Sequence, residues 1–547
     1  MIRTCLLLIA APALAFAQGH PVTPADIAAG DAWWAHIQTL ADGGMEGRLT
    51  GSEGYLRAAR YVVSQFDAAG LQPAGVNGWY QAVKFDVTRV LADKSSMALV
   101  VNGRTEPLEL GRDAVLGSRG TQPESITAPL VFIGYGLHIP EAKYDDFDSP
   151  EVPMSALKGK IVVYVNGGPG DLSGPLKSYA RTSPLAHALA EAGAVGSITI
   201  PNPKTMDFPW ERVASSSSQP GMRLAADPRD AAVAKRHPAL EDLHNMMLSA
   251  TFNPAEAERL FAGTGHSFAE LLALADAQKP LPRFDLHKSL TAHVTTENSK
   301  VESPNIVAKL EGSDALLKNE YVLVSAHLDH LGIGAPIHGK TVYSGAMDDA
   351  SGIASVIEIA KSFSKNPKRP KRSMLFVIFT GEERGLLGSR FFAGRPTVPE
   401  SGIIADLNMD MFMPIFPLRK LHVQGLQEST LADDARAVGA EHGIEIAIDP
   451  EPDRNSFIRT DQYSFVQAGV PALAMKFGWT MWSPEYKAWR QWLAERYHST
   501  ADDLSQPVDR AAAAQFDSFL ADLARRVAND PQKPHYLASS FFHRFEN

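Results

Sequence analysis

Two pairs of adjacent acidic residues have the chemistry to bind a metal ion and to transfer a proton. Asp348 and Asp349 precede a segment whose apolar residues recur at helical spacing, so Asp348 is predicted at a helix N-terminus, where backbone N–H groups favour an anion. Glu382 and Glu383 follow the apolar run 374–379, which predicts a strand buried on both faces. Because consecutive side chains at a strand end point in different directions, one glutamate can bind a metal while its neighbour transfers a proton.

Other predicted strands also end in potential ligands. His327 directly follows the apolar strand 321–326, and the strand predicted at 403–409 ends at Asp410. In an open α/β sheet, ligands bind outside the carboxyl ends of the strands, so these side chains are expected to meet at one edge of the sheet. This regularity is the main local argument for a metal site.

The residue types of the candidate ligands indicate zinc. Imidazole and carboxylate groups are combined in five candidates: His327, Asp348, Glu383, Asp410 and His498. This set suits zinc and is too rich in nitrogen for calcium or magnesium. Five ligands that share one carboxylate can hold two ions about 3.5–4 Å apart. Asp329 is expected to accept the second ring N–H of His327 and thereby fix the tautomer of that histidine.

These motifs resemble the dinuclear-zinc aminopeptidases that are grouped with glutamate carboxypeptidase in clan MH of the metallopeptidases. The resemblance is carried, in order along the chain, by residues 326–332, 345–352, 380–389, 408–411 and 497–498. It implies that His327 and Asp410 hold one zinc ion, that Glu383 and His498 hold the other, and that Asp348 bridges the two. The chain contains neither a His-Glu-x-x-His helix nor a Gly-x-Ser-x-Gly turn, which argues against thermolysin-like and serine-hydrolase mechanisms.

The same resemblance implies hydrolysis of peptide bonds with two Zn²⁺ ions per chain. A water between the ions, its pKa lowered from 15.7 to about 7, would lose a proton to Glu382 and attack the scissile carbonyl. The metals and the Tyr497 hydroxyl would stabilise the oxyanion, and Glu382 would protonate the leaving amine. The peptide bond between Asp348 and Asp349 is expected to be cis.

The elements that position these residues predict an α/β fold with a mixed, mostly parallel central sheet flanked by helices. Residues 46–52 resemble the amino-terminal signature of the family, and residues from about 128 to 282 resemble its inserted protease-associated domain, a smaller β-rich α/β unit. The predicted division is a signal peptide at 1–17, the first part of the peptidase domain at 18–127, the protease-associated domain with its connecting segments at 128–290, the catalytic part at 291–530 and a C-terminal tail at 531–547.

The amino terminus has the pattern of a signal peptide. Arg3 precedes an apolar stretch at 5–16, and Ala-Phe-Ala precedes Gln18, so cleavage is expected after Ala17. The stretch is too short to span a membrane, and no integral membrane segment is expected after its removal. The single cysteine, Cys5, lies inside it, which leaves neither disulfides nor thiolate ligands to the mature chain. We expect an exported protein, either periplasmic or secreted.

Composition narrows the classes of partner. The chain has 547 residues, 45% of them hydrophobic, and a formal net charge of −10. This charge disfavours a dominant role on nucleic acid or on anionic membranes, and the basic run 368–372 is interpreted as a solvated loop. The resemblance implies peptides as substrates, while the oligomeric state stays open.

Candidates for the substrate pocket lie late in the chain. The segment 478–497 carries four of the eight tryptophans, and its helical spacing is typical of a packing stripe. Our hypothesis is that Trp479 or Trp482 lines the substrate pocket. Arg459 lies in a segment that resembles one near the substrate in the family, and it is a candidate for orienting either end of a peptide. The residues His330, His338 and Asp349 are interpreted as surface or capping residues.

The sequence is compatible with three functions. The resemblance favours an exopeptidase that releases amino-terminal residues. A dizinc carboxypeptidase like glutamate carboxypeptidase would share the metal chemistry but should add an arginine cluster for terminal carboxylates, for which Arg454 and Arg459 are available. A noncatalytic binding or receptor protein on the same fold would usually have lost ligands, and none is missing here.

Overall fold

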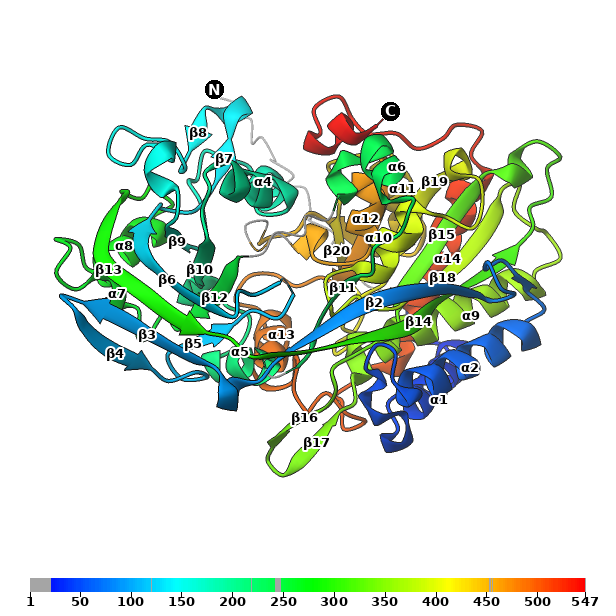
Figure 1. The fold of residues 1–547 in the computed structure, drawn as a ribbon. Helices are drawn as coiled ribbons and strands as arrows, with labels where there is room; N and C mark the ends of the chain where they lie inside the picture. Colours follow the sequence, from blue (N-terminus) through cyan, green and yellow to red (C-terminus); the bar gives the residue numbers. More distant parts are fainter. Residues whose placement is uncertain are drawn as a thin grey trace, which may run out of the picture.

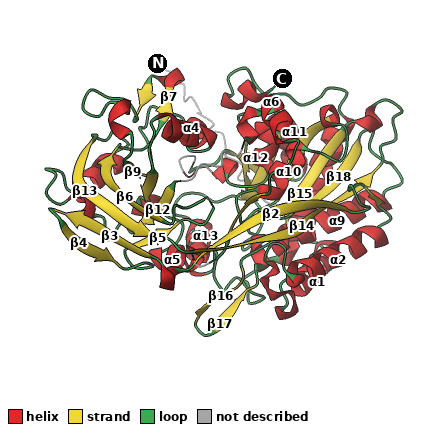
Figure 2. Ribbon diagram, in the orientation of Figure 1, coloured by secondary structure: helices red, strands yellow, loops and turns green. Residues whose placement is uncertain are grey.

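The computed structural model describes residues 21–546, apart from 120, 218, 242–246, 452, 453 and 455. The predicted signal peptide at 1–17 therefore lies outside the described residues. Two β-sheets lie side by side, each with its own helices, and the chain passes between them more than once (Figures 1 and 2). Among the described residues, no helix combines the length and apolar character that crossing a membrane requires.

The larger sheet contains the predicted strands of the catalytic part. Its spatial order is β11 (Gly221–Leu224), β2 (Tyr80–Val90), β14 (Thr296–Leu310), β18 (Ser373–Phe379), β15 (Tyr321–His327), β19 (Ile403–Asn408), β22 (Ala472–Phe477), β20 (Lys420–Gln424) and β21 (Glu445–Ala447), and β1 (Gln72–Pro73) pairs with β14. The four central strands β18, β15, β19 and β22 are parallel, which confirms the predicted mixed, mostly parallel core.

The order of the central strands creates a switch point at β15. The chain leaves β15 through α9 (Ser351–Lys365) and enters β18 on one side of β15, then returns through α10 (Leu387–Gly394) to β19 on the other side. Loops that leave neighbouring strand ends in opposite directions open a crevice at the carboxyl edge of the sheet. The predicted ligands at the ends of β15, β18 and β19 all border this crevice.

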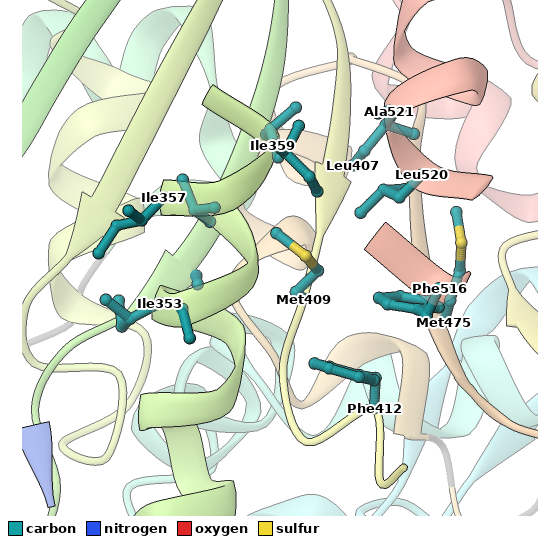
Figure 3. Close-up of a cluster of buried hydrophobic side chains, with 14 of the residues drawn as sticks. Ile353, Ile357, Ile359, Leu407, Met409, Phe412, Met475, Phe516, Leu520 and Ala521 are labelled. Carbon is teal, nitrogen blue, oxygen red and sulfur yellow. The ribbon is translucent and has the colours of Figure 1, made fainter. Parts of the chain in front are cut away.

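The central strands are buried on both faces because helices cover each face. Alternate residues of β18 enter two different clusters, with Phe376 on one face and Val377 on the other. The first face packs against α1 (Pro24–Leu40), α2 (Glu53–Ala68), α9 and α14 (Arg510–Asn529), and the second packs against α6 (Asp230–Arg236), α10 and α12 (Gln462–Gln467). Figure 3 shows the middle of the first cluster, where side chains of several elements meet, among them Ile357 of α9, Leu407 of β19, Met475 of β22 and Phe516 of α14.

The smaller sheet is mixed and has its own core. Its order is β4 (Arg104–Leu108), β3 (Ser96–Val101), β13 (Phe284–His293), β6 (Ser125–Phe132), β9 (Ile161–Val165), β10 (Gly196–Ile200), β12 (Leu248–Phe252) and β5 (Ala114–Leu116). Its helices include α3 (Gly174–Ala180), α4 (Ser183–Glu191), α7 (Glu258–Phe261) and α8 (Phe268–Asp276). We call the residues from β3 to β13, apart from those of β11 and α6, the smaller lobe, and the rest the larger lobe.

The division between the two sheets differs from the predicted boundary at residue 128. Strands β3, β4 and β5 precede that boundary and belong to the smaller sheet, whereas β11 lies inside the predicted insert and pairs with β2 of the larger sheet. The sequence contains a local signal for β3 and β4, the dipeptide Asn102-Gly103, which is typical of a two-residue hairpin turn. In the structure both residues have positive φ and connect Val101 to Arg104. The predicted C-terminal tail at 531–547 is packed, since Phe542 is fully buried against Tyr463 and Tyr536.

A buried arginine joins the amino-terminal signature to the larger sheet. Arg48 is completely inaccessible and donates hydrogen bonds to four backbone carbonyls: Leu40, Leu328, Ser344 and Gly345, at 2.6–2.9 Å. Three of these carbonyls, those of Leu328, Ser344 and Gly345, lie in the loops that carry the predicted ligands His327 and Asp348. Residues 46–52 are therefore a clamp on the crevice loops as well as a surface turn.

This clamp predicts a large loss of stability for Arg48→Met. Four buried carbonyls would lose their donor, and each unsatisfied buried acceptor costs about 1–3 kcal/mol, so the free energy of unfolding should fall by on the order of 3 kcal/mol or more. The control is Arg57→Met, which removes an exposed ion pair to Glu46 and should cost less than about 1 kcal/mol. Urea unfolding followed by circular dichroism measures both, and equal losses would contradict the role given to Arg48.

Candidate metal centre

The crevice brings together all five predicted ligands. His327 is the last residue of β15, Asp348 lies in the turn Ala346–Ala350 before α9, and Glu383 follows β18. Asp410 follows β19, and His498 follows α13 (Pro484–Glu495). Ligand atoms close enough to share an ion occur in two groups that have Asp348 in common: His327, Asp348 and Asp410, and His330, Asp348 and Glu383.

The two carboxylate oxygens of Asp348 face different histidines. Oδ1 lies 3.3 Å from Nε2 of His327, and Oδ2 lies 3.2 Å from Nε2 of His498. The same Nε2 of His327 is 3.9 Å from Oδ1 of Asp410, and Nε2 of His498 is 3.2 Å from Oε2 of Glu383. Asp348 is thus placed to be shared between two sets of ligands.

These separations fit zinc coordination. Tetrahedral zinc with bonds of about 2.0–2.2 Å has its ligand atoms roughly 3.3–3.6 Å apart, close to three of the four distances between the ligand atoms. The buried atoms Nε2 of His327 and Oδ2 of Asp348 have no hydrogen-bond partner among the described residues. Buried polar atoms are normally satisfied, so orphaned donors and acceptors that converge on one point are suited to a cation. The donor set and its geometry therefore fit a zinc site.

His330 is a member of the site that the sequence interpretation missed. The sequence analysis predicts a surface or capping residue here, but His330 is fully buried and its Nδ1 lies 2.7 Å from Oε1 of Glu383. The bridge between Leu49 and His330 pulls the chain back across the crevice after β15 and turns the ring inward. A separation of 2.7 Å is short for two ligands of one zinc and suits an ion pair, so His330 orients Glu383. The signal available in the sequence was the adjacency of two histidines and an aspartate in 327–330.

The prediction that the side chain of Asp329 accepts the second ring N–H of His327 was wrong. Nδ1 of His327 lies 3.0 Å from the backbone carbonyl of Asp329, and the carboxylate of Asp329 is used elsewhere. Its Oδ2 accepts from Thr50 Oγ1 at 2.9 Å and its Oδ1 accepts from the Glu382 backbone N–H at 3.1 Å. The tautomer of His327 is still set by an acceptor two residues on, while the Asp329 side chain connects the 46–52 clamp to the loop of Glu382.

A second buried carboxylate holds the turn that carries Asp348. Asp502 accepts from the backbone N–H groups of Met347 and Asp348 at 2.9 and 3.1 Å. The peptide bond between Asp348 and Asp349 is cis, as predicted. Asp349 is fully buried, so it is not a surface residue, but its carboxylate accepts from the backbone N–H of Gly352 in the first turn of α9 at 2.9 Å, as a capping residue does.

Glu382 has an environment suited to proton transfer. Burial raises the pKa of its carboxyl well above the usual value, the neighbouring His327 opposes this rise, and Asp410 and Glu383 add to it. Tyr497 is close by, and burial likewise raises the pKa of its phenol well above the usual value. The Tyr497 hydroxyl therefore stays protonated near neutral pH and can donate a hydrogen bond.

Two cavities adjoin this centre, and we call them the closed cavity and the wide cavity. The closed cavity, of about 90 Å³, is lined by the carboxylates Asp410 and Glu382 and by the apolar side chains of Trp479, Trp489 and Leu493, among others. The wide cavity, of about 620 Å³, is lined by both lobes and borders Glu383. The two cavities meet at residues that line both: Glu382, Arg459, Tyr497 and His498.

The structure separates the two tryptophan candidates. Trp479 is buried and lines the closed cavity, as the hypothesis required. Trp482 is 74% exposed, lines neither cavity and has its ring 5.5 Å from that of Tyr486. The reason is the start of α13 at Pro484, which places Trp482 before the helix and outside its packing stripe.

The arginine candidates are neutralised by the smaller lobe. Asp207 of that lobe is buried at the closed cavity, with its Oδ2 2.7 Å from Nη1 of Arg459 and its Oδ1 in an ion pair with Arg454. Beside it, the ring of Phe208 lies 5.8 Å from that of His498. Sequence reasoning had no means of finding Asp207, since nothing local in 202–209 relates it to residues 250 positions away.

Sequence comparisons relate this chain to known peptidases. The model of peptidase family M28 matches residues 305–524, which include all five candidate ligands. Leupeptin-inactivating enzyme 1 of Streptomyces exfoliatus is 26% identical over 247 residues, 44% of this chain and 52% of that protein. A probable zinc metalloprotease of Pyrenophora tritici-repentis is 36% identical over 111 residues, 20% of this chain and 24% of that protein. The chain thus spans about half or less of the length of these curated relatives.

A similar fold occurs among solved structures. The aminopeptidase from Aneurinibacillus sp. strain AM-1 superposes with a TM-score of 0.53 at 19% sequence identity, over 92% of this chain and 95% of that one. This likeness extends across both lobes, so it supports the α/β architecture as a whole and the arrangement of the smaller lobe beside the larger one.

The placement of His330 generates a prediction about metal affinity. Because His330 orients Glu383 without being a ligand itself, His330→Ala should weaken zinc binding by about 10–100-fold without abolishing it. Asp348→Ala, which removes the shared carboxylate, should abolish tight zinc binding, and Asp503→Ala, at an exposed ion pair with Lys340, should leave it unchanged. Titration against a chelating dye measures all three, and an unaltered affinity in His330→Ala would refute the assignment.

Proposed function

We propose that this chain, which belongs to peptidase family M28, is an exported zinc-dependent aminopeptidase. The observation that carries the proposal is the pair of ligand sets that share Asp348, with Glu382 beside them at the mouth of a small closed cavity. Export rests on the predicted signal segment, and either the periplasm or the surroundings of the cell is compatible with it.

Two zinc ions are the proposed cofactors. His327 and Asp410 would hold one ion, Glu383 and His498 the other, and Asp348 would lie between them. When bound, zinc supplies a water of lowered pKa and polarises the scissile carbonyl. His330 and Asp502 have supporting roles, because one orients Glu383 and the other fixes the turn of Asp348.

The remaining steps fall to residues of the chain. Glu382 takes a proton from the attacking water and returns it to the amine that leaves when the C–N bond breaks. The Tyr497 hydroxyl donates to the oxygen that gains negative charge during attack, and its raised pKa keeps that proton in place. Arg459, which pairs with Asp207 and lines both cavities, would orient the substrate backbone.

The charges around the closed cavity favour a free amino terminus over a free carboxyl terminus. Glu382 and Asp410 line this cavity, and a substrate ammonium group beside them would be stabilised while a carboxylate would be repelled. The two arginines that a carboxypeptidase would need there are already paired with Asp207. The cavity volume of about 90 Å³ suits one side chain, and Trp479 and Leu493 favour an apolar one.

A hexapeptide in three forms tests this proposal against the carboxypeptidase alternative. The free, the amino-terminally acetylated and the carboxyl-terminally amidated peptide are incubated with the zinc-loaded mature protein, and the products are identified by mass spectrometry. We expect release of the first residue from the free and amidated forms and no hydrolysis of the acetylated form. Release of the last residue from the free and acetylated forms, with no hydrolysis of the amidated form, would support the carboxypeptidase. If none of the three forms is hydrolysed, the result would support a noncatalytic binding or receptor protein.

Neighbouring glutamates provide a matched pair of variants. Glu382→Gln should retain both zinc ions and lose turnover by at least about 10²-fold, because the general base is removed while the ligands stay. Glu383→Gln should lose zinc as well as turnover. Zinc content by atomic emission and initial rates on the free hexapeptide separate the two outcomes. Full activity in Glu382→Gln would show that another group accepts the proton.

A further inference from the structure

His498 differs from the other candidate ligands in how the fold holds it. Three of the others, His327, Glu383 and Asp410, lie at or just after the ends of central strands. Asp348 belongs to the turn that leads into α9, whereas His498 lies in a turn between α13 and α14. Side chains on strands and helices are positioned more precisely than side chains on irregular segments. The position of His498 therefore depends on contacts that other parts of the molecule make with its turn.

The backbone of His498 also needs support. Its φ of 52° lies in the left-handed region, which is unfavourable for a residue with a side chain and persists only where surrounding contacts impose it. On the carboxyl side of His498, the chain is fixed by Asp502, which accepts from the backbone N–H groups of Met347 and Asp348. The amino side, where α13 ends, requires a contact of its own.

Residues 207–212 of the smaller lobe, which we call the contact segment, supply this contact. The segment leads into α5 (Trp210–Ser217), which lies beside α13 at the boundary between the lobes (Figure 1). It is anchored in the smaller lobe, because Nε1 of Trp210 donates to the carbonyl of Gly111 at 2.8 Å, in the turn before β5. The contact segment thus connects the smaller sheet to the end of α13.

Arg212 caps the end of α13. Its Nη1 donates to the carbonyls of Leu493 and Tyr497 at 3.1 and 2.7 Å, and its Nη2 donates to that of Ala494. The last carbonyls of a helix have no partner within the helix, and a positive charge is favourable at this end. Because the Tyr497 carbonyl belongs to the peptide bond that enters His498, Arg212 fixes the backbone directly before the ligand.

Phe208 contacts the side chains of the same two residues. Its ring centroid lies 5.7 Å from that of Tyr497 and 5.8 Å from that of His498. The rings of Tyr497 and His498 are themselves only 4.0 Å apart, so one neighbour restricts the movement of both. Among the described residues that line the two cavities, neither Phe208 nor Arg212 occurs. Both residues therefore act through Tyr497 and His498 and not through contact with a substrate.

We propose that Arg212 and Phe208 are positioning residues for the metal centre, so that the smaller lobe determines how firmly the ion beside His498 is held. The ion beside His327 depends on the strand ends of the larger lobe. The inference rests on the proposed function, because it requires two bound zinc ions, and it adds a role for the smaller lobe in holding one of them. The two ions should therefore respond differently to changes in the contact segment.

Stepwise zinc binding separates the two ions. Competition with a chelating dye gives the two dissociation constants of the mature wild-type protein, and His498→Ala and Asp410→Ala show which constant belongs to which set of ligands. We expect Arg212→Met to weaken the step that is lost in His498→Ala by about 10–100-fold, while the other step stays within about twofold of wild type. Phe208→Ala should weaken the same step, because the two rings lose their neighbour.

Further variants and rates distinguish positioning from a general loss of structure. Arg212→Lys keeps a charged donor near the end of α13 and should recover most of the lost affinity. Arg104→Met is the control in the same lobe and should leave both steps unchanged, because Arg104 is exposed on β4, at the edge of the smaller sheet opposite β5. At saturating zinc, kcat of Phe208→Ala on the free hexapeptide should stay at least about tenfold below wild type with KM within about threefold, because Tyr497 is displaced and the cavity linings are kept.

The outcomes separate this inference from the proposed function. Unchanged zinc binding in both Arg212→Met and Phe208→Ala, or equal weakening of both steps, would overturn the inference and leave the aminopeptidase. Phe208→Ala removes no hydrogen bond, so it decides the matter should Arg212→Met fail to fold. A wild-type protein that binds fewer than two zinc ions, or that leaves the free hexapeptide intact, would overturn the proposed function, and the inference would fall with it. Weakening confined to the step of His498, with recovery in Arg212→Lys, supports both.

Discussion

The structure depends on the burial of several carboxylates at one edge of a sheet. Asp348, Glu382, Glu383 and Asp410 lie at the meeting point of three strand ends, where their mutual repulsion is strong because little water screens it. Nearby histidines offset part of this charge, and cations would offset the rest. Without bound cations, this repulsion lowers the stability of the folded protein, so the contacts that hold the carboxylates in place must be rigid. This constraint explains why the buried side chains of Arg48 and Asp502 form hydrogen bonds with the backbone of the loops that carry the ligands.

Both lobes contribute residues to the site. The switch point at β15 in the larger lobe supplies the candidate ligands, and the smaller lobe supplies the surroundings. Arg212 of the smaller lobe donates to the carbonyls of Leu493 and Tyr497, next to His498, and Asp207 fixes Arg459. Removal of the smaller lobe would therefore leave the ligands but loosen the turn of His498 and alter what can approach the site. In this account, the larger lobe supplies the ligands and the smaller lobe completes their positioning.

Much of the larger lobe and its site followed from the sequence, because strand ends and helix starts are local features. The strands at 321–326 and 374–379 and the cis bond at Asp348 were predicted correctly, and the candidate ligands that follow these strands lie close together as expected. The errors concern contacts that depend on tertiary packing. Whether His330 points inward depends on a bridge to Leu49, and the pairing of Asp207 with Arg459 joins the two lobes. The first boundary of the smaller lobe was missed because β3 pairs with β13, nearly 190 residues later, and β4 joins the sheet only through β3.

The central claim is that Asp348 is shared by two zinc ions. Its most direct test is a crystal structure of the zinc-loaded protein with diffraction data recorded on both sides of the zinc absorption edge. The account predicts two anomalous peaks about 3.5–4 Å apart, one beside His327 and Asp410 and the other beside Glu383 and His498, each next to one oxygen of Asp348. A single peak, or a second peak bound by His330 in place of His498, would contradict it.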